Sequence, residues 1–171
     1  MRYAATWLAG VVAIAGCSAA PRFTAAHQRA ERDSVAQVLD QWRNALDAGD
    51  FARAATFYST DSAFRWFQDG ELRYRSAAEL GDTMRAMAPA LRSFSLSLIE
   101  PEITAIAPGV VLVTTNFAQK MTDTSGETIG LAGAISMTVV HGNAGWRFLV
   151  GHTSSVILPV DSAAGGKRRK S

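Results

Sequence analysis

The residue best suited to acid–base chemistry in this sequence is His152. In an extended strand it shares one face with Phe148, Val150 and Ser154, because alternate side chains point the same way. An imidazole on the wall of a pocket can donate or accept a proton near neutral pH. The alternative, which we favour, is a histidine satisfied by the backbone or by Ser154, since no carboxylate partner stands at a suitable spacing.

Other kinds of reactive site have little support in the sequence. His27, His141 and His152 are far apart and lack the spacing of metal ligands, so we expect neither a metal nor another cofactor. The sequence contains no phosphate-binding loop and no nucleophile elbow.

Several aromatic side chains are candidates for the lining of a ligand pocket. Trp42 and Trp66 are large apolar groups with one N–H donor each, and Tyr58 carries a hydroxyl. Each also has a structural interpretation. Trp42 lies on an apolar helical stripe that suits the core, and Trp66 suits the core as well as it suits a pocket. The Tyr58 hydroxyl can form a structural hydrogen bond at a helix end. The complete set that we predict for the pocket is Trp42, Tyr58, Phe64, Trp66, Phe148, His152 and Ser154.

The single cysteine, Cys17, ends an apolar run that follows Arg2. The run is shorter than the roughly 20 residues that a spanning helix needs. Residues 14–17, Ile-Ala-Gly-Cys, resemble the lipobox of a bacterial lipoprotein, in which residues 1–16 would be removed and Cys17 would carry lipid. An ordinary signal peptide and a helix with a buried thiol are the alternatives. We expect a lipid anchor in the cell envelope, at the outer membrane or its periplasmic face where the host has one.

The basic character of the whole chain is misleading. Of 17 basic residues, Arg2 belongs to the predicted signal and four belong to the tail segment 167–170, so the body between Cys17 and Val160 is slightly acidic. We therefore expect no nucleic-acid partner. The tail, residues 161–171, is predicted to be a basic, disordered end.

The elements that position these residues are predicted to be helices first and strands later. Apolar residues at spacings of three and four indicate a helix over 25–48, and a short one over 51–58 follows. Asp69-Gly70 is typical of a tight hairpin between strands, and Ser76 to Glu79 form a capping box for a third helix that Pro89 ends. Further strands are predicted over 91–107, 110–122, 127–140 and 146–158.

The predicted fold class is therefore α+β. A curved antiparallel sheet, made of a hairpin and a four-strand meander, is wrapped by three N-terminal helices into a cone. Residues 17–24 are predicted to be a tether, and residues 25–160 one domain.

Two segments carry a resemblance to a known family. Residues 42–51, Trp-Arg-Asn-Ala-Leu-Asp-Ala-Gly-Asp-Phe, and residues 58–64 resemble the opening of a nuclear transport factor 2-like domain. Residues 145–154 are similar to the last strand of its SnoaL-like, ketosteroid isomerase-like branch. The resemblance covers roughly Val35 to Ser155 and implies a cone-shaped fold with a pocket at its wide end, but this fold hosts many functions.

The resemblance argues against steroid isomerisation. The isomerase's donor tyrosine, aspartate base and protonated aspartate would fall on Trp42, Trp66 and Met137 of this chain. Tryptophan cannot abstract a proton from carbon, and methionine cannot donate to an oxyanion.

The sequence leaves three functional interpretations. The leading one is a lipid-anchored envelope protein that binds a small apolar or amphipathic molecule, without catalysing a reaction. The second is a SnoaL-like isomerase, dehydratase or hydrolase that uses His152 as acid and base. The third is a module whose sheet face recruits another envelope protein. Dimers are common in the resembling family, and the small residues Gly130, Ala132, Gly133 and Ala134 suit the close approach of a second copy.

Overall fold

The computed structural model describes residues 23–159. The predicted signal segment 1–16, Cys17, most of the tether and the basic tail lie outside the described residues. None of the helices within residues 23–159 is both long and apolar enough to cross a membrane.

Two helices open the domain. Helix α1 (Ala25–Asp47) begins where the Thr24 hydroxyl accepts a hydrogen bond from the backbone N–H of His27. Its apolar stripe is buried, as the spacing predicted, and consists of Val35, Leu39, Trp42, Ala45 and Leu46. Gly49, at a φ of 71°, reverses the chain. Asp50 then caps the short helix α2 (Phe51–Ala55) by accepting from the Arg53 N–H at 2.9 Å.

A short hairpin and a third helix follow. Strands β1 (Arg65–Gln68) and β2 (Glu71–Tyr74) are joined by Asp69 and Gly70, whose φ values of 52° and 88° are those of the predicted tight turn. Ser76 caps helix α3 (Ala77–Met87), and the 3-10 turn η1 (Ala88–Ala90) holds Pro89 and leads into the sheet.

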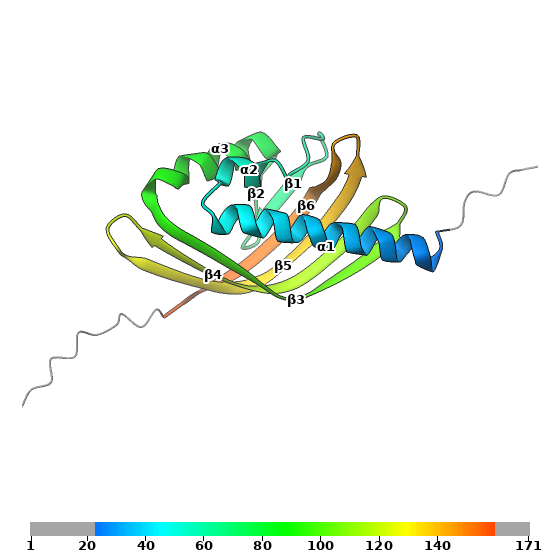
Figure 1. Ribbon diagram of the computed structural model, residues 1–171. Coiled ribbons are helices and arrows are strands. Elements are labelled where there is room, and N and C mark those ends of the chain that lie inside the picture. The colour runs from blue at the N-terminus through cyan, green and yellow to red at the C-terminus, as the bar shows by residue number, and fades with distance from the viewer. Residues whose placement is uncertain (1–22, 160–171) are drawn as a thin grey trace, which may run out of the picture.

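Four long strands complete a six-stranded sheet. They are β3 (Leu91–Ala107), β4 (Val110–Asp123), β5 (Thr128–Gly142) and β6 (Gly145–Leu158), and each pairs antiparallel with the next. The strand order across the sheet is β2-β1-β6-β5-β4-β3. The expected α+β class and curved sheet are confirmed (Figure 1).

One pairing differs from the expected antiparallel arrangement, because β1 runs parallel to β6. The hairpin thus joins the meander through a contact between residues more than 80 positions apart, such as Trp66 with Gly151. Tight turns enforce antiparallel pairing only between neighbours in sequence, so no local signal set the direction of this pair. The sheet is therefore mixed.

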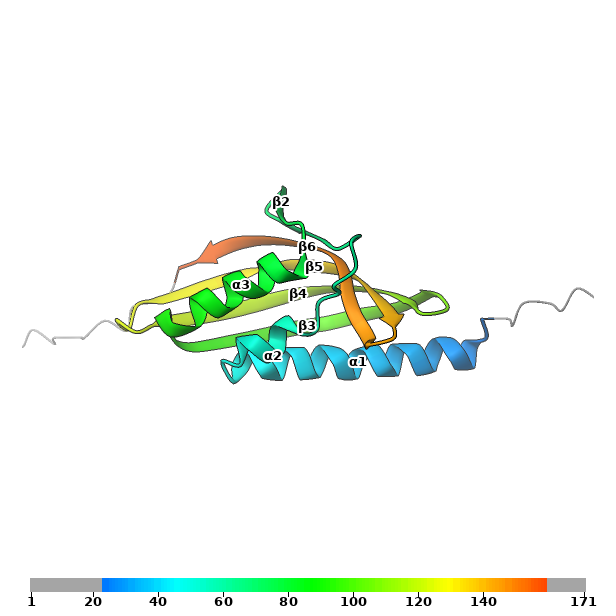
Figure 2. The same ribbon diagram turned by 90° about the horizontal axis from the view of Figure 1, so that it is seen from above.

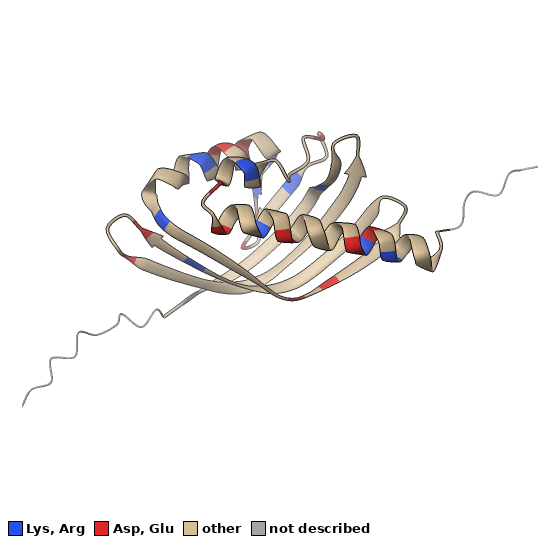
Figure 3. Ribbon diagram, in the orientation of Figure 1, with Lys and Arg blue, Asp and Glu red and all other residues tan. Residues whose placement is uncertain are grey.

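The helices lie on the concave side of the sheet. Figure 1 shows the strands curving beneath α1, and Figure 2, seen from above, shows α1 running along the β3 side of the sheet. Helix α3 packs on α2, where the missing side chain of Gly81 permits close contact with Ala55. Charged residues are frequent on the helices and sparse on the central strands (Figure 3).

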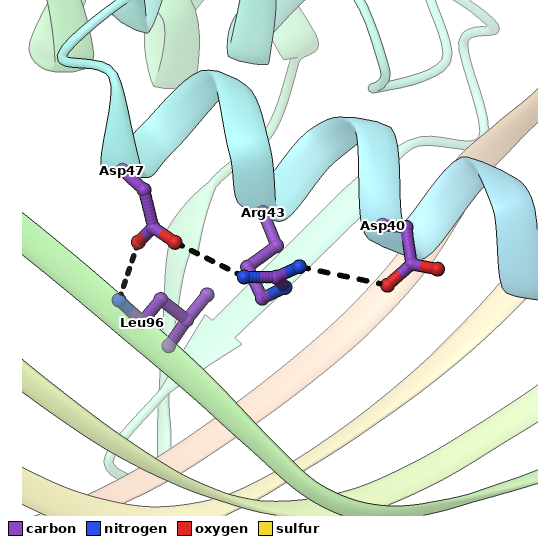
Figure 4. A network of polar contacts seen from close by, with 4 residues as sticks. All are labelled: Asp40, Arg43, Asp47 and Leu96. Carbon is purple, nitrogen blue, oxygen red and sulfur yellow. Dashed lines mark hydrogen bonds and ion pairs between the residues drawn. The ribbon is translucent and has the colours of Figure 1, made fainter.

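A polar link joins the end of α1 to the exposed edge of the sheet. The Asp47 carboxylate accepts a hydrogen bond from the Leu96 backbone N–H at 2.8 Å and pairs with Arg43 at 3.2 Å (Figure 4). Because β3 is an edge strand, this N–H has no neighbouring strand to bond. Arg43 also lies 3.8 Å from Asp40, whose side chain is 72% exposed. The Asp47 contact fixes β3 against the helix.

We expect Asp47→Ala to lower the free energy of unfolding by about 1–2 kcal/mol, because it leaves a half-buried N–H without an acceptor. Asp40→Ala is the matched control, since it also replaces a helical aspartate but removes only a long, exposed ion pair worth well under about 1 kcal/mol. Urea unfolding of both variants measures the difference. Equal loss in the two variants would contradict the role of the Asp47 link.

Candidate functional site

A cavity of about 630 Å³ lies between the helices and the concave face of the sheet. Its interior is formed by ten buried side chains, all apolar or aromatic: Trp42, Leu46, Phe51, Tyr58, Trp66, Leu80, Phe94, Leu96, Phe117 and Ile135. Its mouth is formed by exposed or half-buried side chains: Gln68, Asp69, Glu71, Arg73, Tyr74, Thr83, Met84, Met87, Gln119, Met121, Leu131 and Thr153. The cavity is thus apolar inside, whereas its opening combines polar and charged side chains with three methionines and a leucine.

Trp66 reaches the cavity because the residue beside it on β6 is a glycine. A Cβ atom at Gly151 would lie 2.2 Å from the indole ring of Trp66, so any side chain there would displace the ring. The two residues are direct partners in the parallel β1–β6 ladder. Gly151 therefore provides the space in which Trp66 lies across the sheet and forms part of the cavity wall.

A β-bulge reverses the expected face of His152. Val139 pairs with Phe148 and Thr138 with Val150, which leaves Leu149 as an extra residue in β6. Phe148 and Gly151 are both buried although they are three positions apart, and Thr153 is the next residue that lines the cavity. His152 lies on the outer face of the sheet.

The expectation that His152 and Ser154 share a pocket-lining face with Phe148 is therefore wrong. Both residues are exposed. His152 lies in a shallow outer depression of about 410 Å³, together with Glu100, Glu102 and Asn116. Strict alternation places residues 148, 152 and 154 on the same face of a strand. The extra residue of the bulge shifts the alternation by one position, so residues 152 and 154 point to the opposite face.

The remaining predicted residues divide between the cavity and the core. Trp42, Tyr58 and Trp66 line the cavity. Phe64 and Phe148 do not line it, because both are fully buried behind Tyr58, with ring centroids 6.1 and 5.4 Å from that ring. This corrects their placement in the predicted pocket. They support the lining by edge-on aromatic packing.

Sequence reasoning missed most of the residues that strands β3, β4 and β5 contribute to the cavity wall. Phe94, Leu96, Phe117 and Ile135 enter the cavity from β3, β4 and β5, and three methionines gather at its mouth. Their alternation with polar residues marked a buried face. It did not reveal where the helices leave that face uncovered, because this depends on how elements distant in sequence pack together.

Tyr58 is the titratable group buried most deeply in the lining. Burial raises the pKa of its hydroxyl far above the usual value, and nearby Tyr74 adds to the rise, whereas the adjacent Trp42 side chain opposes it. The hydroxyl is therefore protonated at neutral pH. Trp42 Nε1 is buried without a hydrogen-bond acceptor in the part of the chain that the structure describes.

The carboxylates of the site lie at its mouth, not inside. Asp69 is fixed there by accepting the Ser155 backbone N–H at 2.8 Å, and Glu71 and Arg73 are exposed beside it. Across residues 23–159, no three His, Cys, Asp or Glu side chains are grouped closely enough to hold a metal ion. The lining carries no histidine. The acidic groups of the cavity are thus confined to its opening.

Comparison with known proteins adds a family and a set of similar structures. Residues 35–159 match the family model described as a SnoaL-like domain. No curated protein sequence gives a significant match.

Among solved structures, a protein of Novosphingobium aromaticivorans provisionally described as a scytalone dehydratase has a TM-score of 0.68 at 14% identity, covering 75% of this chain and 85% of its own. A nuclear transport factor 2-like superfamily protein of Salmonella enterica has a TM-score of 0.65 at 14% identity and coverages of 81% and 97%. A hexachlorocyclohexane dehydrochlorinase, LinA-type3 of Novosphingobium barchaimii, has a TM-score of 0.65 at 13% identity and coverages of 78% and 92%. At such low identity these likenesses concern the fold alone.

We expect Gly151→Ala to displace Trp66 and to cost about 1–3 kcal/mol of folding free energy, as overpacking does. Gly142→Ala is the matched control, because a Cβ atom at this exposed strand position meets nothing within 4 Å. Thermal unfolding and tryptophan emission of both variants provide the measurement. A Gly151→Ala protein with unchanged stability and emission would contradict the described packing of Trp66 on β6.

Proposed function

The chain belongs to the SnoaL-like domain family, and we propose that it uses the cavity to bind a small apolar or amphipathic molecule without transforming it. The observation that carries this proposal is the cavity itself, because its volume of about 630 Å³ suits a small organic molecule and its interior is apolar. The polar and charged side chains at the mouth suit the hydrated end of an amphipathic ligand.

The choice of binding over catalysis rests on the side chains within reach of a ligand. Structurally similar proteins are described as a dehydratase and a dehydrochlorinase, names that denote elimination reactions. Such reactions need a base close to a carbon-bound proton. By resemblance, the positions of the isomerase groups hold Trp42 and Trp66 in the lining and Met137 in the core, none of which is a base. The enzyme alternative that relied on His152 loses support, because His152 faces away from the cavity.

We further propose that the protein is attached to the cell envelope through lipid on Cys17. The support for this proposal is the sequence of residues 14–17 and the short apolar run before it. Helix α1 begins at Ala25, eight positions after Cys17, so lipid on Cys17 would join the domain to the membrane through a short stretch of chain.

A homodimer through the outer face of the sheet completes the proposal. The outward side chains of β5 include the small Ala132 and Ala134, and β5 has no Asp, Glu, Lys or Arg, which suits close contact with a second copy. Gly133 has a different role, because a Cβ atom there would lie 1.9 Å from the Ser154 carbonyl oxygen of the same sheet.

We expect native mass spectrometry of the mature protein, purified gently from its host, to show an added mass that denaturation removes. Leu131→Trp, which fills the cavity mouth, should lower occupancy at least about tenfold. Ile106→Trp is the control, because it adds the same side chain at an exposed position outside the lining. Two results would contradict binding in the cavity. One is that the unaltered protein shows only the mass of its own chain and lipid, and the other is that folded Leu131→Trp carries as much bound ligand as the unaltered protein.

We expect Cys17→Ser to abolish metabolic labelling with a fatty acid and to release the protein into the soluble fraction. The physical reason is that lipid at this position would supply the membrane affinity. Cell fractionation and labelling of both forms provide the measurement. A Cys17→Ser protein that stays in the membrane fraction would overturn the lipid-anchor proposal.

A further inference from the structure

We propose that the ligand is a neutral molecule with a hydrogen-bond acceptor, which receives a hydrogen bond from the Tyr58 hydroxyl while Trp42 donates to the Tyr58 oxygen. This inference rests on the binding function proposed above and names the chemistry of its ligand.

The orientation of Tyr58 is set by the aromatic rings around it. Trp42, Trp66 and Phe148 meet the Tyr58 ring edge-on, with centroid distances of 6.4, 5.4 and 5.4 Å, and Phe64 meets it likewise at 6.1 Å. Such enclosure prevents the ring from turning away. The two side chains that influence its hydroxyl, Trp42 and Tyr74, both line the cavity. The hydroxyl is therefore placed at the cavity wall.

The direction of hydrogen bonding follows from the chemistry of Trp42. An indole N–H can only donate, and Trp42 Nε1 is buried with no acceptor among the described residues. Trp42 is close enough to the Tyr58 hydroxyl to affect its pKa, although Nε1 completes no hydrogen bond among the described residues. When Tyr58 turns its oxygen lone pair toward Trp42, its own O–H is left to donate into the cavity. A ligand must then present an acceptor.

The charge of the ligand is constrained by the same interior. Burial raises the pKa of Tyr58, so its hydroxyl keeps the proton and remains a donor at neutral pH. Charged lining residues, namely Asp69, Glu71 and Arg73, are confined to the exposed mouth. A carboxylate placed inside would lose its hydration without gaining a cation. A ketone, ether or ester on an apolar body satisfies both constraints.

Three probes of similar size test the inference: 2-acetylnaphthalene, which has a neutral acceptor, 2-ethylnaphthalene, which has none, and 2-naphthoate, which is charged. We expect the ketone to bind about tenfold more tightly than the hydrocarbon, a ratio typical of one buried hydrogen bond, and more tightly than the carboxylate. Dissociation constants are measured on the full-length mature protein, freed of bound ligand, by calorimetry.

Variants assign the preference to the two residues. Tyr58→Phe should reduce the ketone-to-hydrocarbon ratio to about one, and Trp42→Phe should reduce it partially while the hydrocarbon still binds. Trp146→Phe is the control, because it shortens another tryptophan, one outside the cavity lining, and should leave the ratio unchanged. The ratio reports the hydrogen bond, whereas a general loss of packing weakens both probes alike.

The outcomes separate this inference from the function on which it rests. Binding of all three probes with a ratio near one, preference for the carboxylate, or a ratio unaffected by Tyr58→Phe would overturn the inference and leave cavity binding standing. Failure of every probe to bind the unaltered protein would overturn the binding function as well.

Discussion

The rest of the structure depends on the parallel pairing of β1 with β6. This pairing attaches the β1–β2 hairpin to the meander and extends the sheet beyond β6. It is reinforced where the Ser59 N–H donates to the Phe148 carbonyl and the Phe148 N–H to the Phe57 carbonyl, both at 2.9 Å. It also places the Trp66 ring over Gly151, where the ring forms part of the cavity wall. Without this pair the sheet would lack that side of the cavity.

An open cavity of this kind requires rigid surroundings, because side chains otherwise collapse into unfilled space. The aromatic residues behind the lining meet that requirement. Phe148 packs edge-on against both Trp42 and Tyr58, and Phe64 also packs edge-on against Tyr58. At the opposite wall, Asp47 holds the edge strand at Leu96. The cavity therefore stays open because neighbouring elements brace its walls.

The fold by itself does not decide what happens in the cavity. Proteins with the same architecture carry names that denote different reactions, and one carries only the name of the superfamily. In this chain the cavity interior offers the protonated Tyr58 hydroxyl and apolar rings, while the carboxylates of the lining remain at the mouth.

The sequence alone determined the elements whose signals are local. Apolar spacing defined α1, Asp69-Gly70 defined the hairpin turn, and Ser76 marked the start of α3, because each depends on residues within a few positions. For Trp42 the sequence left a core position and a pocket position as alternatives, and the structure places it on the buried stripe of α1 and in the cavity lining. Only the tertiary structure decided the direction of the β1–β6 pair and the bulge at Leu149. Both arise from hydrogen bonds between strands distant in sequence, and the bulge moves His152 to the outer face because one extra residue inverts the alternation of a strand.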